Sequence, residues 1–203
     1  MAESIRTLET LELVGGIPCL DFVNTVNSRL EPVHDYFREY SDLYSWGHKL
    51  GFLSSAQFDQ LQKLAQTDPA TAESTLLAAH TLRDLLYRLF SNAARGAEPD
   101  PKDRQSFVVF YGEAIAQSRL QKKDDHYVPT WDPAGSLDAL LWPVIYSAGK
   151  LLLSGDLGHV RECPGCGWLF LDTSKNQSRR WCSMNTCGVR AKMRRYHNRQ
   201  RVK

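Results

Sequence analysis

Four of the five cysteines lie in the last 41 residues of this 203-residue chain, and they form two pairs. Cys163 and Cys166 enclose two residues, 15 residues follow, and Cys182 and Cys187 enclose four. This spacing is typical of a tetrahedral zinc site in which four thiolates fill every coordination position. The sequence therefore predicts one structural Zn²⁺ rather than a catalytic one, because no position stays open for water or substrate. A redox dithiol pair and an iron–sulfur site are the alternatives.

The size of the cysteine-rich segment supports the zinc interpretation. A module of about 45 residues buries too little apolar surface to offset its chain entropy, so it usually needs metal. Small residues surround Cys163 and Cys166 as in a metal-binding turn, and residues 168–171 are typical of a strand. A helical pattern follows Cys187, which places this ligand in a first helical turn. We expect a treble-clef-like or ribbon-like finger.

The distribution of charge divides the chain near the same point. Residues 159–203 hold 11 basic and 2 acidic side chains, a net charge of +9, whereas residues 1–158 carry −7. We therefore expect two domains, 1–158 and 159–203, of which the second meets a polyanion. The N-terminus lacks the basic and apolar regions of an export signal, and no stretch is long enough to cross a membrane. These features predict a cytoplasmic protein, whose reduced thiols favour metal over disulfides.

Residues 189–201 form a helical pattern that is basic on most of its surface. Val189, Met193 and Tyr196 share a narrow stripe of this helix, which we expect to pack on the zinc core. Arg forks and amide groups suit phosphates and base edges. We predict nucleic-acid contacts by cations and one amide of the loop and helix: Lys175, Arg179, Arg180, Arg190, Lys192, Arg194, Arg195 and Asn198. A simpler interpretation is that cations balance the −2 charge of the zinc centre, but two or three would suffice and the segment has 11.

Residues 1–158 are expected to be mainly helical. Periodicity and capping residues predict helices over about 41–50, 54–64, 70–94, 100–115 and 136–153, the last kinked at Pro143. Residues 11–14 and 17–26 suggest two extended runs around a Gly-Gly turn, with a helix opening at Asn24 as the alternative. Residues 122–133 suit a loop or short hairpin. The predicted fold class is α+β, with a mainly helical N-terminal domain, a short β-hairpin and a small zinc finger.

The residues around the cysteines resemble the CGNR-type zinc fingers. The similar stretches are Cys163 to Asn176, then Ser178-Arg-Arg-Trp-Cys-Ser-Met, and Cys187-Gly-Val-Arg190. In the body, Leu20-Asp-Phe-Val-Asn-Thr25 and Leu82-Arg83 are similar to the ABATE domain that usually precedes this finger. The resemblance implies that the four cysteines are the ligands and that Arg190 is the signature arginine. Val189 replaces the Asn of the family motif, so any hydrogen bond of that amide is lost here.

The resemblance also implies a function. Proteins of this kind are bacterial and are regarded as stress-induced transcription regulators, in which a DNA-binding finger is joined to a domain thought to sense a small ligand. Asp21, Asn24 and Arg83 are polar residues among apolar ones and are the candidate ligand contacts. The structural alternatives are an N-cap at Asn24 and a buried ion pair between Asp21 and Arg83.

Other classes of function are weighed against a DNA-binding regulator. Residues 1–158 contain no nucleophile–base pair, phosphate loop or hydrolase motif, so we do not expect an enzyme. An RNA-binding protein stays open, because Trp181, Tyr196 and the arginines suit stacking on unpaired bases. A zinc-stabilised protein-interaction module is the third candidate. The oligomeric state is not specified, and a homodimer is among the states left open.

Overall fold

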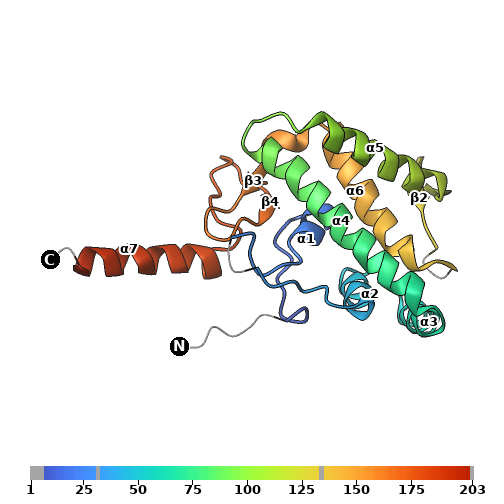
Figure 1. Ribbon diagram of the computed structural model, residues 1–203. Coiled ribbons are helices and arrows are strands. Elements are labelled where there is room, and N and C mark those ends of the chain that lie inside the picture. The colour runs from blue at the N-terminus through green and yellow to red at the C-terminus, as the bar shows by residue number, and fades with distance from the viewer. Residues whose placement is uncertain (1–6, 31–32, 133–134, 202–203) are drawn as a thin grey trace.

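The computed structural model describes residues 7–30, 33–132 and 135–201, which are mostly helical (Figure 1). The helices are α1 (Pro18–Val23), α2 (Tyr40–Lys49), α3 (Ser55–Thr67), α4 (Pro69–Ala94), α5 (Pro101–Ala116), α6 (Leu141–Leu153) and α7 (Val189–Arg201). The strands pair antiparallel as β1 (Arg119–Lys123) with β2 (His126–Thr130) and β3 (Val160–Glu162) with β4 (Leu169–Leu171). The predicted α+β class is confirmed.

Local capping signals set the beginnings of three helices. Ser54 and Gln57 form a capping box at the start of α3, in which each side chain bonds the backbone N–H of the other residue. Asp68 and Asp100 cap α4 and α5 with their carboxylates, and a proline follows each of them. Proline is tolerated there because the first N–H groups of a helix have no partner within it. The helices predicted over 54–64, 70–94 and 100–115 are therefore confirmed within three residues.

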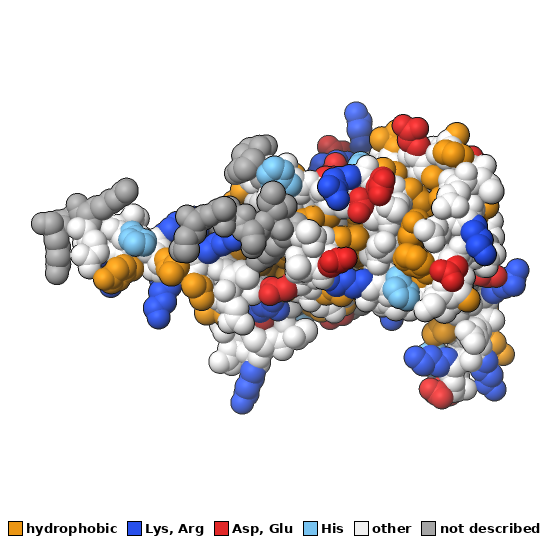
Figure 2. Space-filling view, turned by 90° about the horizontal axis from the view of Figure 1, so that it is seen from below, with side chains coloured by type: hydrophobic (Ala, Val, Ile, Leu, Met, Phe, Trp, Pro, Cys, Tyr) orange, Lys and Arg blue, Asp and Glu red, His pale blue; other side chains and the backbone are white. Residues whose placement is uncertain are grey.

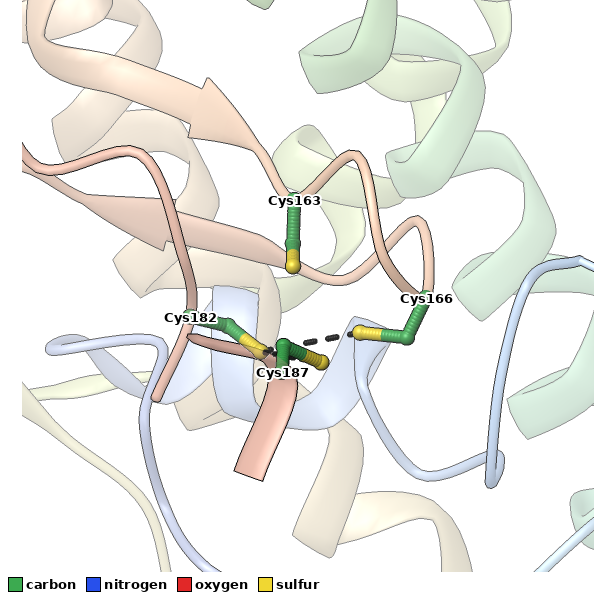
Figure 3. A group of neighbouring side chains, drawn as sticks. All are labelled: Cys163, Cys166, Cys182 and Cys187. Atoms are coloured by element: carbon green, nitrogen blue, oxygen red, sulfur yellow. Dashed lines mark hydrogen bonds between the residues drawn. The ribbon is translucent and has the colours of Figure 1, made fainter. Parts of the chain in front are cut away.

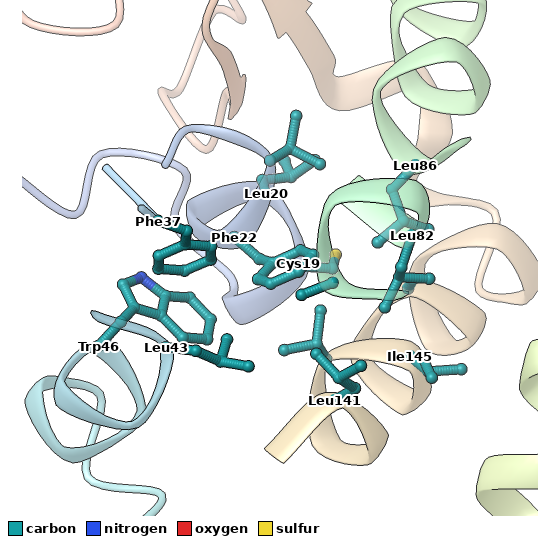
Figure 4. Close-up of a cluster of buried hydrophobic side chains, with 14 of the residues drawn as sticks. Cys19, Leu20, Phe22, Phe37, Leu43, Trp46, Leu82, Leu86, Leu141 and Ile145 are labelled. Atoms are coloured by element: carbon teal, nitrogen blue, oxygen red, sulfur yellow. The ribbon is translucent and has the colours of Figure 1, made fainter. Parts of the chain in front are cut away.

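Helix α4 is the central element of the body. It contacts α1, α2, α3 and α5 and also the strands β3 and β4, while α1 lies against both α4 and α6. Figure 4 shows the core between these helices, where Phe22, Phe37 and Trp46 meet with ring centroids 5.4–5.9 Å apart. The core therefore forms around α1, which brings the segment after it toward the cysteines.

Two expectations for the body are wrong. Residues 18–23 form α1 instead of an extended run, because Pro18 opens the helix and burial on several sides removes the helical period from the sequence. The helix predicted over 136–153 is divided, because a separate 3₁₀ turn, Leu137–Leu140, precedes α6. Pro143 is the third residue of α6, where its missing N–H needs no partner within the helix.

The segment after α5 is a hairpin, which is one of the two structures, loop or hairpin, predicted for residues 122–133. It runs from Arg119 to Thr130 and turns at Asp124, whose φ is 53°. Pro133, at the end of the predicted loop, lies outside the described residues, as do residues 1–6, 202 and 203 of the two predicted domains. No helix in the described ranges is long and apolar enough to cross a membrane.

The core is continuous across the predicted boundary at residue 158. The boundary falls in a 3₁₀ turn, Asp156–His159, that leads directly into β3. Strands β3 and β4 pack on α4, and β4 also contacts α1. Trp168, Leu169 and Phe170 belong to the same buried cluster as Leu82 and Leu86 of α4. The cysteine-rich segment and the helical body thus share one core.

Candidate metal centre and nucleic-acid interface

The side chains of Cys163, Cys166, Cys182 and Cys187 converge on one point (Figure 3). All four are buried, and their Sγ atoms lie within 4.8 Å of one another. The Sγ of Cys182 is 3.5 Å from that of Cys166 and 3.7 Å from that of Cys187. With Zn–S bonds of about 2.3 Å, a tetrahedral ion holds its sulfurs about 3.8 Å apart. The donor set and the spacing therefore fit one structural Zn²⁺, as predicted.

The first cysteine pair lies in a tight turn between β3 and β4. The Cys163 N–H donates to the carbonyl of Trp168 at 2.8 Å, and the Gly167 N–H donates to the carbonyl of Cys163 at 2.8 Å. Gly167 has φ +72°, a conformation that side chains disfavour, and a Cβ on Gly165 would touch the Cys187 sulfur at 3.3 Å. Both glycines are needed for the turn to close around the metal.

The second pair bridges the loop after β4 and the start of α7. Cys187 lies in a π-helical turn, Met184–Gly188, that continues directly into α7. The ligand predicted in a first helical turn thus lies in the π-helical turn that precedes α7. The thiolate is the form of cysteine that a metal ion requires. Cys19 is buried far from this centre, and burial raises its pKa to about 12.

A segment of the body clamps the metal-binding turn. The backbone N–H of Arg29 and the hydroxyl of Ser28 donate to the carbonyl of Cys166 at 2.7 and 3.1 Å. The Arg29 guanidinium donates to Asp84 of α4 at 2.9 Å and lies over the ring of Tyr87, 4.4 Å from its centroid. Arg29 thus joins the turn around Cys166, through its backbone N–H, to helix α4, through its side chain.

Asn24 joins the body to β4 through two buried hydrogen bonds. Its amide donates to the carbonyl of Leu169 at 2.8 Å and accepts from the N–H of the same residue at 2.9 Å. Nearby, the indole of the buried Trp168 donates to the carbonyl of Val26 at 2.8 Å. The Asn24 amide therefore takes the place of a neighbouring strand at the edge of β4. The backbone groups of Leu169 at this edge find their hydrogen-bond partners in the body rather than in water.

The three candidate ligand residues have internal partners. Asp21 accepts a hydrogen bond from the N–H of Gly15 at 2.7 Å, and Arg83 forms an ion pair with Asp35 instead of Asp21. Asn24 ends α1 as its C-cap, so the expected N-cap is also wrong. All three side chains are buried, and none of them lines the three hollows at α2–α4, beside Cys163 and beside Arg161. Ligand contact by Asp21, Asn24 and Arg83 stays a prediction, and their observed contacts are structural.

Asp21 should make stability depend on pH. Burial raises its pKa from 3.8 to about 6, against the effect of the Gly15 hydrogen bond. Because the pKa of Asp21 is higher in the folded state, protonation of its carboxyl group favours the fold. This contribution is complete below about pH 3.8 and is lost as pH rises past about 6. Asp21→Asn removes the charge, so the variant should gain stability over the unsubstituted protein as pH rises. We expect the difference in unfolding free energy between the two zinc-loaded proteins, measured in urea, to be about 1–2 kcal/mol more favourable to the variant at pH 8 than at pH 5. A difference that is the same at both pH values would contradict this assignment.

Helix α7 extends away from the body, and its cations and apolar stripe are exposed (Figures 1 and 2). The predicted packing of the stripe on the zinc core is wrong, because Val189, Met193 and Tyr196 are 44, 57 and 61% exposed. Ala191, on the opposite side of the helix, is the buried residue. The structure therefore leaves exposed the apolar stripe and the predicted nucleic-acid contacts Arg190, Lys192, Arg194, Arg195 and Asn198.

The loop between β4 and Cys182 holds the other predicted contacts. Lys175 and Arg180 are exposed. Arg179 is half-buried, donates to the carbonyls of Trp181 and Cys182, and lies over the ring of Phe170 at 4.4 Å. The structure thus gives Arg179 a role in holding the loop, and its contact with nucleic acid stays a prediction. Sequence reasoning missed Arg161 of β3, which lines a hollow with this loop.

A four-cysteine zinc finger built onto a helical body, with a basic helix extending from the metal site, defines the class of this protein. The model of the CGNR zinc finger family matches residues 159–200. The model of the ABATE family, described as "Putative stress-induced transcription regulator", matches residues 16–155. The latter covers more than half of the chain, so the protein belongs to the ABATE family and carries a CGNR zinc finger. None of the curated proteins compared with this chain matches it.

Proposed function

We propose that this protein is a DNA-binding transcription regulator whose α7 and neighbouring loop contact duplex phosphates. The observation that carries the proposal is an exposed basic helix held beside a structural metal site. Residues 173–203 contain ten cations and no carboxylate, so no acidic side chain within the segment neutralises them. A polyanion is the partner that this surface fits.

The charge pattern of α7 adds to this argument. Arg190 precedes Arg194, and Arg195 precedes Arg199, by four residues, so both pairs place like charges next to each other on the helix. Such pairs oppose helix formation, and a helix of this length has little stability of its own without packing. Phosphates would remove the repulsion, which supports a helix adapted to an anionic partner.

The position of Trp181 favours duplex DNA over single-stranded RNA. Trp181 is half-buried, and the guanidinium of Arg180 lies over its ring, 5.1 Å from the centroid. An indole covered in this way is a poor platform for an unpaired base. The exposed stripe of Val189 and Met193 suits apolar contact with thymine methyl groups, and an α-helix fits the major groove.

The phosphate contacts of α7 can be tested by salt dependence. The double variant Arg194→Gln with Arg195→Gln should lower the magnitude of the log–log salt slope for duplex DNA by about 0.9 per lost contact, or about 1.8 in total. Fluorescence anisotropy from 50 to 200 mM salt measures this slope. Lys122→Gln with Lys123→Gln removes two exposed cations of the β1–β2 hairpin and is the matched control. An unchanged slope in the α7 variant would exclude the helix from the interface.

Competition distinguishes the three functions. Duplex DNA should displace a labelled duplex more effectively than structured RNA does at the same salt concentration. Stronger displacement by RNA would favour the RNA-binding alternative. If neither nucleic acid binds at low salt, the exposed stripe of α7 is better explained as a protein-binding surface.

We also propose that the helical body regulates the finger by binding a small ligand. Support comes from the shared core, because a ligand that prefers one arrangement of the body changes DNA affinity only through contacts that join the two parts. A hollow of about 390 Å³ between α2, α3 and α4, lined by residues that include Tyr40, Tyr44 and Glu73, is a candidate position for that ligand.

A further inference from the structure

A second cationic feature lies beside the metal site, away from the exposed faces of α7. A hollow of about 370 Å³ opens between β3 and the loop after β4. Its lining includes three arginines, one glutamate and two neutral polar residues: Arg161, Arg179, Arg180, Glu162, Gln177 and Ser178. We propose that this hollow is a binding site for a phosphate group, with Arg161 and Arg180 as its main contacts.

Both arginines are held in place before any ligand binds. Arg161 donates to the carbonyls of Gly158 and Val160 at 2.6 and 3.0 Å, which anchors its guanidinium at the foot of the hollow. Its other terminal nitrogen lies 3.5 Å from the Gln177 side-chain oxygen. Arg180 lies over the ring of Trp181. Pre-positioned guanidinium forks bind phosphate oxygens in pairs and lose little side-chain entropy in doing so.

The one carboxylate in the lining is already saturated. Glu162 accepts hydrogen bonds from Tyr87 at 3.0 Å, Ser91 at 2.8 Å and Arg95 at 3.0–3.2 Å. Arg95 neutralises its charge, so three arginines remain against no unpaired acid in the lining. The hollow therefore has an excess of positive charge that favours an anion.

A neighbouring carboxylate is also engaged within the loop. Asp172 is 1% exposed and accepts from the N–H groups of Ser174 and Arg179 at 3.0 and 2.9 Å. These bonds shape the loop. Hydrogen bonding by the Ser174 side chain, followed by the two backbone N–H bonds and the charge of Arg161, holds the pKa of Asp172 below its usual range. Asp172 thus fixes the wall of the hollow and does not enter it as a competing ligand.

Charge compensation of the zinc centre does not account for these arginines. That role fits Arg179, whose guanidinium bonds the carbonyls of Trp181 and of the ligand Cys182. The hydrogen bonds of Arg161 described above involve Gly158, Val160 and Gln177, and none of these residues is a metal ligand. Arg161 and Arg180 are therefore available to a second anion.

The phosphate has two sources with the same chemistry. It belongs either to a nucleic-acid backbone that continues past α7 or to a free phosphorylated small molecule. The first source rests on the proposed function, whereas binding of phosphate itself does not. Two measurements on the full-length, zinc-loaded protein separate them.

The first measurement titrates inorganic phosphate at constant ionic strength and follows the arginine Nε–Hε signals by NMR. We expect saturable shifts for Arg161 and Arg180, and at least tenfold weaker binding in Arg180→Gln, since Arg180 is exposed and its loss should not unfold the chain. Arg161→Lys keeps the charge but not the fork and should also weaken binding. Arg104→Gln, an exposed arginine of α5, is the control. The site would be overturned by shifts that do not saturate, or by a phosphate affinity that stays unchanged in both Arg180→Gln and Arg161→Lys.

The second measurement compares duplex DNA binding of the same variants. A backbone phosphate in the hollow predicts that Arg180→Gln lowers the magnitude of the salt slope by about 0.9 and that DNA displaces bound phosphate. An unchanged slope without displacement assigns the site to a free phosphorylated molecule. If the α7 variants fail to alter DNA binding while phosphate still binds, the proposed function fails and the site stands.

Discussion

Removal of zinc is expected to disorder the finger and to destabilise the helical body with it. The metal-binding turn is clamped by Ser28 and Arg29, and the cysteines belong to the same buried cluster as α4. Binding of a structural Zn²⁺ to such a site is worth about 10–16 kcal/mol at neutral pH, and this energy is folding energy. Chelation should release one zinc per chain, and amide exchange should then rise in residues 160–200 and also in residues 24–29.

A cysteine outside the metal site provides the control. Cys166→Ser should lose the metal and reproduce the effect of chelation, whereas Cys19→Ala removes a buried thiol that is no ligand and should retain one zinc. Zinc is measured by atomic emission, and protection by amide exchange with mass spectrometry. If exchange rises only after residue 160 and the segment at 24–29 keeps its protection, the shared core does not couple the two parts.

Asn24→Ala is expected to lower the free energy of unfolding by about 2–5 kcal/mol, because it leaves the N–H and the carbonyl of Leu169 buried without partners, at about 1–3 kcal/mol each. Urea denaturation of zinc-loaded protein measures the loss. Asn92→Ala is the matched control, since the Asn92 side chain donates to the carbonyl of Arg88 in its own helix at 2.9 Å. A loss equal to that of the control would show that Asn24 does not hold β4 to the body.

Both predictions concern the same structural arrangement. The metal site is fixed on the body through Asn24 and Arg29, whereas α7 leaves that site and exposes most of its side chains. We propose that a change in the body reaches the base of α7 through these contacts and that the exposed helix meets the partner. This division fits a regulator in which one rigid unit presents a basic helix.

The sequence by itself determined the features that depend on near neighbours. The four zinc ligands follow from the spacing of two cysteine pairs, since a tight turn and a helix start fix where the thiols of each pair point. The ends of α3, α4 and α5 follow from capping residues that act within one helical turn. The basic character of the C-terminal segment needs no fold at all.

Only the tertiary structure decided which surfaces and charges meet. The period of Val189, Met193 and Tyr196 correctly defines an apolar stripe, but whether another part of the chain covers it depends on the direction in which α7 leaves the metal site. Arg83 pairs with Asp35, 48 residues away along the chain, and Asn24 bonds Leu169, 145 residues away. Such contacts depend on how helices pack around α1, and a local pattern carries no information about partners so distant along the chain.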